Sequence, residues 1–459
     1  MLPNVTPTDR YDAPTAPRAG RAPGGTLADR YRAVRAWTHV LCEPLVTEDY
    51  VVRSMHDVSP TKWHIAHTSW FFETFVLSPH LPGYRPINPR YAYLFNSYYV
   101  QAGERHCRAQ RGLVTRPTVA EVYDYRAHVD EHMLRLLAHL AEAGVDDPAF
   151  GSLAALVELG LNHEQQHQEL ILTDIKHVLW TNPLRPAYLP RNAAAHSGGS
   201  APVALDWAAI PEGVHEVGHA GAGFAFDNES PRHRQFLEAA RVASRLVTNA
   251  EYLEFMADGG YHRPELWLSA AWDVVRAEQW EAPLYWEREG DGWATFTLGG
   301  TLPVAPAEPV CHVSFFEADA YARWAALARW SGARLPTEAE WEVAAASAGP
   351  ASDAAGTFAD SQRFHPAAIG GAAGAGAGGP AQLYGDVWQW TASQYTPYPG
   401  FRPAAGVIGE YNGKFMCDQW VLRGASCATP RTHARLTYRN FFPAATRWQF
   451  SGIRLAAGA

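Results

Sequence analysis

Two histidines separated by one helical turn are the residues of this chain that most clearly suggest chemistry. His163 and His167 lie in a run, residues 153–178, whose apolar side chains recur at helical spacing. Both imidazoles are therefore expected on the same face of one helix. Two imidazoles one turn apart can share one divalent ion, but two ligands hold an ion only weakly. The pair predicts a metal site that needs a third ligand from elsewhere in the chain.

The third ligand is expected from residues 59–67, where His64 and His67 stand one helical turn apart. Either imidazole could reach the pair from a neighbouring helix, so the residues alone leave both open. Three histidines without a carboxylate ligand leave open positions on an octahedral metal. Such a site favours a ferrous ion that binds O2 and substrates together over a hydrolytic zinc ion.

The same stretch also matches a hydrolase pattern, because residues 163–167 read His-Glu-Gln-Gln-His. This is the HExxH signature of zinc proteases, in which two histidines bind zinc and the glutamate, here Glu164, is the general base. A five-residue pattern is only moderately specific. Zinc hydrolysis therefore stays an alternative reading of the site.

Four predicted helices must position these residues. Their apolar periodicity places them at about residues 27–41, 60–77, 119–143 and 153–178. Ser59 and Pro60 read as the N-cap and first position of the second helix, while Thr118 and Glu121 form a capping box for the third. Four helices with such connections predict a bundle whose metal site lies between facing helices.

The connection between the second and third helices is long and aromatic. It runs from about residue 79 to residue 116 and contains Tyr98 and Tyr99. Connections of that length are usually functional or disordered, and this one is too aromatic for disorder. A phenol near the metal could deliver a proton during the reaction, so both tyrosines are candidate acids.

Composition divides the chain into two domains. Residues 1–26 read as a disordered tail, residues 27–181 as the metal-binding helix bundle, and residues 182–206 as a linker rich in Pro, Ala and Gly. Residues 207–459 alternate short apolar runs with turn residues and read as a loop-rich domain. Its short helices are expected at about residues 249–257, 317–327 and 337–346. The predicted fold class is a two-domain α+β protein.

The overall composition argues against several functional classes. The formal net charge of -9 opposes general affinity for nucleic acid or for an anionic membrane. No stretch reads as a signal peptide or as a membrane span, so a cytoplasmic protein is expected. The 5 cysteines are scattered and form no CxxC pair, which fits reduced thiols better than disulfides or a zinc ribbon.

Two groups of motifs make the chain resemble a known family. Residues 59–73 and 162–169 resemble the N-terminal DinB-like bundle of the iron-dependent sulfoxide synthases of ergothioneine biosynthesis. The second half resembles the formylglycine-generating-enzyme (sulfatase-modifying-factor) domain, a C-type-lectin-like fold, in residues 226–231, 247–249, 332–342, 385–391 and 422–426. The presence of both halves in this order is much more specific than the HExxH pattern alone.

The resemblance implies a metal and a reaction. In that family three histidines hold Fe(II), which implies His67, His163 and His167 here and leaves His64 as a neighbour. The implied reaction joins the imidazole C2 of hercynine, a trimethylhistidine, to a thiol sulfur and oxidises that sulfur to a sulfoxide with O2. Holding three reactants at one metal converts a multimolecular encounter into a local one.

The resemblance also implies substrate-binding residues. Gln166 and Asn440 are expected to hold hercynine, and Tyr411 is a candidate for a cation-π contact with its quaternary ammonium group. Arg439 and Arg447 are candidate anchors for a substrate carboxylate.

The identity of the thiol is inferred from two phenylalanines. Family members specific for γ-glutamylcysteine carry a Trp-Asp pair where this chain has Phe441 and Phe442 after Asn440. Losing that acid and gaining an apolar ring favours the smaller thiol, cysteine. The subgroup that uses cysteine takes its catalytic tyrosine from the bundle loop, and residues 94–99 resemble that loop, which again implies Tyr98 or Tyr99.

Two further functions stay open at this point. One is a selenoneine-type synthase of the same architecture that takes a selenosugar, and the other is a zinc hydrolase or thiol transferase built on a DinB-like bundle. Metal content separates the zinc enzyme from the others, and the choice of sulfur or selenium donor separates the remaining two.

Overall fold

The chain divides into two compact units. The computed structural model describes residues 25–143, 148–190, 203–349, 356–369 and 379–459. The first unit comprises residues 1–182 with 405–410, and the second comprises residues 183–404 with 411–459. Most of the predicted disordered tail and part of the predicted linker lie outside the described residues, so the predicted domain limits stay predictions.

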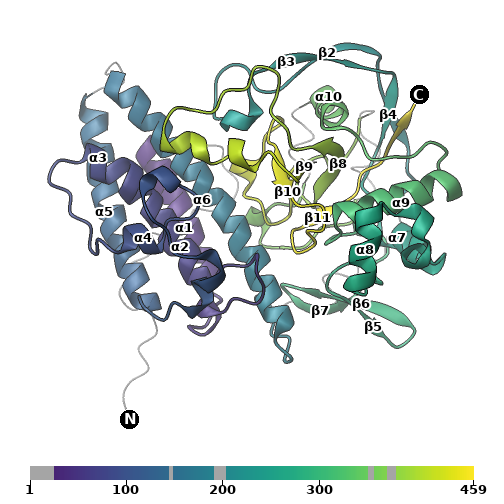
Figure 1. Cartoon of the computed structure of the whole chain (residues 1–459), viewed down its shortest axis with the longest axis horizontal. Coiled ribbons are helices and arrows are strands. Elements are labelled where there is room, and N and C mark those ends of the chain that lie inside the picture. Colours follow the sequence, from purple (N-terminus) through teal and green to yellow (C-terminus); the bar gives the residue numbers. More distant parts are fainter. Residues whose placement is uncertain (1–24, 144–147, 191–202, 350–355, 370–378) are drawn as a thin grey trace. The chain divides into compact units, whose positions relative to one another are not determined.

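The first unit is built on four long helices that lie side by side (Figure 1). They are α1 (Leu27–Cys42), α2 (Thr61–Phe72), α5 (Val119–Ala143) and α6 (Pro148–Thr181). Helix α2 packs against α5 and α6, and α1 packs against the same two helices. The predicted four-helix bundle is therefore confirmed.

The two predicted helix starts differ in outcome. At α5 the Glu121 N–H donates to Thr118 Oγ1 at 3.2 Å and the Thr118 N–H donates to Glu121 Oε2 at 2.7 Å, which confirms the capping box. At α2 the predicted Ser59 cap is wrong, because the N-cap is Pro60 and makes no side-chain cap hydrogen bond. The Ser59 hydroxyl instead accepts an N–H from Arg111 at 3.0 Å.

The aromatic connection after α2 is held by its own contacts. The α2 helix continues through a π-helical turn (Glu73–Leu77) into α3 (Ser78–His80), and one further short helix, α4 (Tyr91–Leu94), was not predicted. Beyond it, the Asn96 amide donates to the Tyr99 carbonyl at 2.9 Å and accepts the Tyr99 N–H at 3.3 Å. These bonds fix the backbone beside Tyr98 and Tyr99 without a regular helix.

The described strands of the second unit form four small sheets. The first orders β1 (Trp207–Ile210), β4 (Ala240–Ala243) and β12 (Ala456–Gly458), and the second orders β10 (Asn440–Phe442), β9 (Trp420–Arg423), β8 (Trp388–Gln394) and β11 (Ser451–Gly452). The others are the hairpin of β2 (Gly213–Val217) with β3 (His233–Leu237) and the three strands β5 (Trp286–Glu289), β6 (Gly292–Thr297) and β7 (Gly300–Pro303). All neighbours are antiparallel except the parallel pair β8 and β11.

Four longer helices accompany these sheets (Figure 1). They are α7 (Asn249–Ala257), α8 (Ser269–Ala277), α9 (Phe315–Ala328) and α10 (Glu338–Ala348). Capping boxes start α7, α9 and α10, and these are the helices that the turn and apolar pattern indicated. The predicted α+β architecture is confirmed.

None of the helices in the described part of the chain combines the length and the apolar character that a membrane span requires.

Candidate metal centre

Three histidines from two helices of the bundle meet at one point. His163 and His167 come from α6 and His67 comes from α2, and one ring nitrogen of each lies within 4.8 Å of those of the other two. All three side chains are buried, with 2 to 8% of their surface exposed. Among the histidine, cysteine and carboxylate side chains of the described residues, these three histidines form a cluster that could hold a metal ion.

The group of side chains that could hold a metal ion includes His67 and not His64. The Nδ1 atom of His67 lies 2.6 Å from the Phe95 carbonyl oxygen, which can only accept. The His67 tautomer is therefore Nδ1–H, and its Nε2 lone pair is left for a ligand. His64 Nδ1 instead contacts His167 Nδ1 at 2.8 Å, and His64 Nε2 contacts Asp174 Oδ2 at 3.0 Å.

Aromatic rings hold the imidazoles in place. Trp63 stacks on the His67 ring at 4.5 Å between ring centroids and 14° between planes, and Trp70 also stacks on His67 at 5.3 Å and 15°. Phe71 packs against His163 at 5.0 Å. The rings restrict rotation of these side chains and exclude water from one side of the site.

The burial of the three histidines suits a metal ligand. Burial lowers the pKa of His163 to about 4. It also lowers the pKa values of His67 and His167 well below the usual range, and the neighbouring imidazoles push in the same direction. Neutral imidazole is the form that binds a metal ion. Three neutral, converging imidazoles without a carboxylate thus fit a divalent transition metal.

Glu164, the glutamate of the HExxH pattern, is committed to a buried ion-pair network. Its Oε2 accepts from Arg35 at 2.9 Å, and its Oε1 accepts from Arg126 at 2.6 Å and from Thr38 at 2.6 Å. Although burial alone would raise the pKa of this carboxyl group, the two arginines lower it to about 2. A carboxylate this acidic and fully occupied is a poor general base.

The two candidate tyrosines differ in their surroundings. The Tyr98 side chain is half-buried, and its hydroxyl oxygen accepts an N–H from Arg108 at 2.5 Å. Tyr99 is buried and packs on Trp70 at 5.7 Å and on Phe75 at 5.1 Å between ring centroids. Tyr99 therefore contacts Trp70, which in turn stacks on His67, whereas Tyr98 lies near the charges of Arg108 and Arg111.

An arginine cluster beside the tyrosines was not singled out from the sequence. Arg111 is 5% exposed, and its guanidinium lies 3.4 Å from the centre of the Trp63 ring that stacks on His67. Burial lowers the pKa of Arg111 to about 9, although Tyr98 opposes this, and the charges of Arg108 and two further arginines, Arg53 and Arg105, add to the lowering. In the described part of the chain no carboxylate pairs with these four arginines. The spacing of three residues between Arg105, Arg108 and Arg111 was the available signal.

Gln166 is half-buried on α6, between His163 and His167 in sequence. Its position on the helix keeps it on the side of the histidines, since it follows His163 by three residues. A role in binding hercynine stays a prediction.

Three of the predicted residues of the second unit form strand β10, and Tyr411 is linked to it through Phe415. Asn440, Phe441 and Phe442 form this strand, and the Asn440 side-chain oxygen accepts the N–H of Phe441 at 2.9 Å. Phe441 stacks on Tyr395 at 4.0 Å and 9°, whereas Phe442 points to the other face of the strand and packs on Trp448 at 5.9 Å. Tyr411 joins the first group through Phe415, which it contacts at 5.9 Å.

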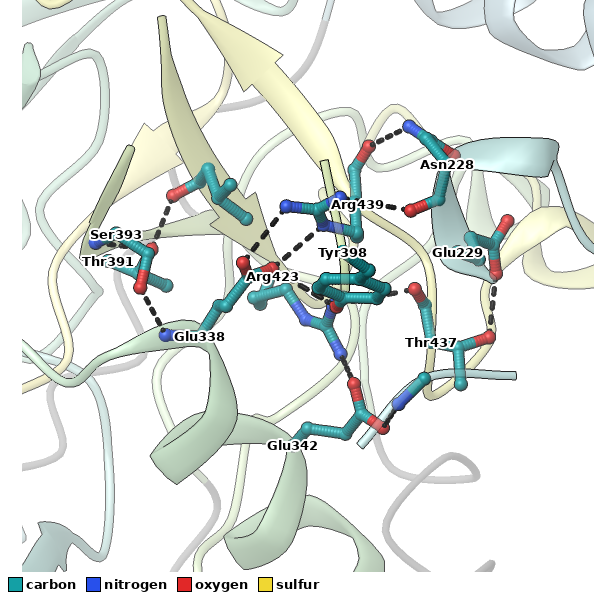
Figure 2. Close-up of polar contacts among 12 residues, drawn as sticks. Asn228, Glu229, Glu338, Glu342, Thr391, Ser393, Tyr398, Arg423, Thr437 and Arg439 are labelled. Atoms are coloured by element: carbon teal, nitrogen blue, oxygen red, sulfur yellow. Dashed lines mark hydrogen bonds and ion pairs between the residues drawn. The ribbon is translucent and has the colours of Figure 1, made fainter. Parts of the chain in front are cut away.

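Both predicted carboxylate anchors are already engaged in internal ion pairs. Arg439 donates to both oxygens of Glu338 at 2.9 and 3.0 Å and to the Asn228 carbonyl oxygen at 2.9 Å (Figure 2). Arg447 donates to Glu317 at 2.9 Å. Only 2% of Arg439 and 9% of Arg447 is exposed, so in this structure both arginines stabilise the interior of the second unit. Their predicted contact with a substrate stays a prediction.

The cysteines form no disulfides. None of the five sulfur atoms is joined to another, and the exposed Cys417 forms no disulfide with the buried Cys427. The expectation of reduced thiols agrees with this arrangement.

Comparison with known proteins matches both units. Residues 30–171 match the DinB superfamily, and residues 201–459 match the sulfatase-modifying factor enzyme 1-like domain.

The chain is 33% identical over 457 residues to a hercynine oxygenase of Mycolicibacterium smegmatis, with 94% of this chain and 98% of that protein covered. It is 34% identical over 418 residues to a hercynine oxygenase of Mycobacterium tuberculosis, with 87% and 91% covered. A third relative, ergothioneine biosynthesis protein 1 of Schizosaccharomyces pombe, is 24% identical over 249 residues, which cover 50% of this chain and 27% of that protein. The predicted family resemblance is confirmed: the chain belongs to the hercynine oxygenase family and joins a DinB-superfamily bundle to a sulfatase-modifying-factor-like domain.

Proposed function

We propose that the chain is an Fe(II)- and O2-dependent sulfoxide synthase of ergothioneine biosynthesis that joins hercynine to a thiol. In the balanced reaction the imidazole C2–H and the thiol S–H bonds break and a C–S bond forms. One atom of O2 becomes the sulfoxide oxygen, and the other leaves as water with the two hydrogens. The names of the relatives, hercynine oxygenase and ergothioneine biosynthesis protein 1, support this proposal.

The observation that carries the proposal is the set of three buried, neutral imidazoles with no carboxylate among them. His67, His163 and His167 would hold Fe(II), which supplies O2 activation and binding positions for substrates when bound. The tryptophans on either side of His67 would keep this face of the site dry.

The fate of Glu164 supports an oxidative enzyme over a zinc hydrolase. A zincin needs this glutamate as the base that activates water. Here both of its oxygens accept from arginines on other helices, and its pKa lies at about 2. Withdrawing it from these contacts would leave the buried Arg126 guanidinium without a counter-charge and Arg35 with Asp130 alone, which is costly.

The residues of the loop support a role in proton delivery and in anion binding. Tyr98 is the favoured proton donor, because its oxygen accepts from Arg108 and its ring lies in the electrostatic neighbourhood of Arg111. The same Arg111 charge acts on His67 and His167. The arginine cluster is thus a candidate anchor for the carboxylate of the thiol substrate.

Cysteine is the proposed thiol, on the grounds that Phe441 and Phe442 replace an acid and add no charge. The arginine cluster would also accept a second carboxylate, so the alternative donor γ-glutamylcysteine is tested together with cysteine. A selenosugar is the third donor to test.

The test is mass spectrometry of the products formed by Fe(II)-loaded protein from hercynine and O2, with cysteine and γ-glutamylcysteine in competition. We expect hercynyl-cysteine sulfoxide as the main product, and matched samples without metal or loaded with zinc should give none. A γ-glutamyl product keeps the reaction and overturns the choice of thiol. Absence of a sulfoxide with either thiol overturns the proposed reaction, after which the selenosugar is tested.

A further inference from the structure

We infer that His64 and Asp174 are positioning residues that set the tautomer of the metal ligand His167. His64 lies between the two side chains: its Nδ1 is 2.8 Å from His167 Nδ1, and its Nε2 is 3.0 Å from Asp174 Oδ2. His167 and Asp174 stand seven residues apart on α6, two helical turns, so they occupy the same face of that helix. The inference rests on the metal site of the proposed function.

The three groups are buried together. His64 is 2% exposed, Asp174 is 3% exposed and His167 is 8% exposed. The Asp174 oxygen that faces His64 also accepts the Ser59 N–H at 2.8 Å, just before α2 begins. That bond fixes the Asp174 carboxylate relative to α2, the helix that carries His64. Ser59 thus contributes its N–H to Asp174 and does not cap α2.

Hydrogen-bond roles propagate from the carboxylate to the metal ligand. A carboxylate can only accept, so His64 donates to it from Nε2–H. In neutral His64 the Nδ1 atom is then the acceptor, and His167 must donate from Nδ1–H. The hydrogen of neutral His167 is thereby placed on Nδ1, and its Nε2 lone pair is left for the metal.

The opposite arrangement would block the site. If His64 donated from Nδ1, His167 Nδ1 would have to accept and the hydrogen of neutral His167 would move to Nε2. That nitrogen could then bind a metal only after losing its hydrogen. Asp174 therefore does for His167, through His64, what the Phe95 carbonyl does directly for His67.

The direct test reads the tautomers in the wild-type, metal-free full-length protein. Ring 15N shifts from solid-state NMR on 15N-histidine protein distinguish protonated from bare nitrogens, with signals assigned by comparison with His64→Phe and His167→Phe. We expect hydrogen on Nε2 of His64 and on Nδ1 of His167. Hydrogen on Nε2 of His167 would overturn the inference. The measurement does not depend on the folding of His64→Phe or His167→Phe, because the histidine signals are also assigned by titrating Zn(II) into the wild-type protein.

The second test measures Co(II) affinity and the visible spectrum of bound Co(II). Asp174→Leu and His64→Phe should lower the affinity by about 10- to 100-fold, as loss of partners of metal ligands does. Asp174→Asn should lose less than Asp174→Leu, because its amide oxygen can still accept from Ser59 and His64. His177→Phe is the matched control, since His177 is a buried histidine of α6 that contacts Ser54 and should leave the affinity unchanged.

The outcomes separate this inference from the proposed function. Unchanged Co(II) affinity and spectrum in folded Asp174→Leu and His64→Phe would overturn the positioning role and leave the function standing. A wild-type protein that binds no divalent metal at the histidine triad, His67, His163 and His167, would overturn the proposed function itself. An equal loss in the His177→Phe control would show that the effect is general packing and would also overturn the positioning role.

Discussion

The two units each bury a cluster of polar side chains, and the clusters differ in how charge is balanced. In the second unit Glu338 pairs with Arg439, and Arg423 pairs with Glu342 and lies 3.7 Å from Glu338 (Figure 2). In the bundle no carboxylate pairs with His67 or His167, whose charged neighbours are other imidazoles and Arg111. The charges of the Glu338 and Arg439 cluster balance one another, whereas the histidine triad of the bundle would be stabilised by an added ligand.

The difference indicates which buried polar groups are structural. Burial alone would lower the pKa of Arg439, but Glu338 raises it above the usual value, so this pair is stabilised as ions. The pKa values of the triad are lowered by burial, so its imidazoles are kept neutral and available. Burying a polar or charged group without a partner costs free energy, and such groups occur mainly at sites that bind a ligand or perform chemistry.

The comparison predicts the largest functional loss at the triad. His167→Ala should abolish iron binding and turnover, because the remaining two imidazoles hold an ion weakly. Its metal-free form should lose little stability compared with variants of the Glu338 and Arg439 cluster of the second unit. Iron content after loading and O2 consumption with hercynine and thiol check this, and full activity in His167→Ala would refute the ligand assignment.

Breaking the charge-balanced cluster of the second unit should destabilise the protein without changing the metal site. Glu338→Ala leaves Arg439 buried without its carboxylate and should cost about 3–5 kcal/mol of the free energy of unfolding of the second unit. Denaturant titration followed by tryptophan fluorescence measures this loss. Folded Glu338→Ala should still bind Co(II) like the wild type, and a stability unchanged from wild type would contradict the structural role.

Arg111 of the arginine cluster is a buried charge without a paired carboxylate, so its removal should affect substrate binding more than stability. Arg111→Met should raise the KM for the thiol about 10- to 100-fold, which corresponds to losing roughly 1.5–3 kcal/mol from a hydrogen bond to a charged group. Its free energy of unfolding should stay unchanged or rise, because a desolvated charge is removed. Steady-state kinetics with varied thiol tests this. Arg135→Met, on the exposed side of α5, is the control.

The two tyrosines sharpen the distinction within the loop. Tyr98→Phe should divert O2 use from sulfoxide formation toward oxidation of the thiol alone, because the proposed proton donor is lost while Arg108 and the triad remain. Tyr99→Phe should change the product ratio less. Product ratios by mass spectrometry decide, and unchanged ratios in both variants would remove the bundle tyrosines from the mechanism.

The smallest effect is expected at an exposed ion pair. Glu216 and Arg232 lie 2.9 Å apart on the hairpin region of the second unit, with 60% and 44% of their side chains exposed. Glu216→Ala should change the free energy of unfolding by less than about 1 kcal/mol, since water screens such pairs. A loss as large as that of Glu338→Ala would show that burial and charge balance do not separate the two kinds of pair.

The sequence determined the parts of this protein that depend on near neighbours in the chain. The bundle helices follow from apolar spacing, and the His163 and His167 pair follows from a separation of four residues on one helix. The capping boxes at Thr118 and Thr248 depend on contacts three residues away. The family resemblance likewise rested on short runs of residues.

Only the tertiary structure decided how distant side chains pair. His64 and His67 share one helix, so the choice between them depended on where Phe95, Asp174 and α6 lie in space. Glu164 accepts from Arg35, which is 129 positions away in the sequence, and from Arg126, which is 38 positions away. The occupation of Arg439 by Glu338 joins residues 101 positions apart. Periodicity and local capping carry no information on such pairings, because they are set by the packing of whole helices and sheets.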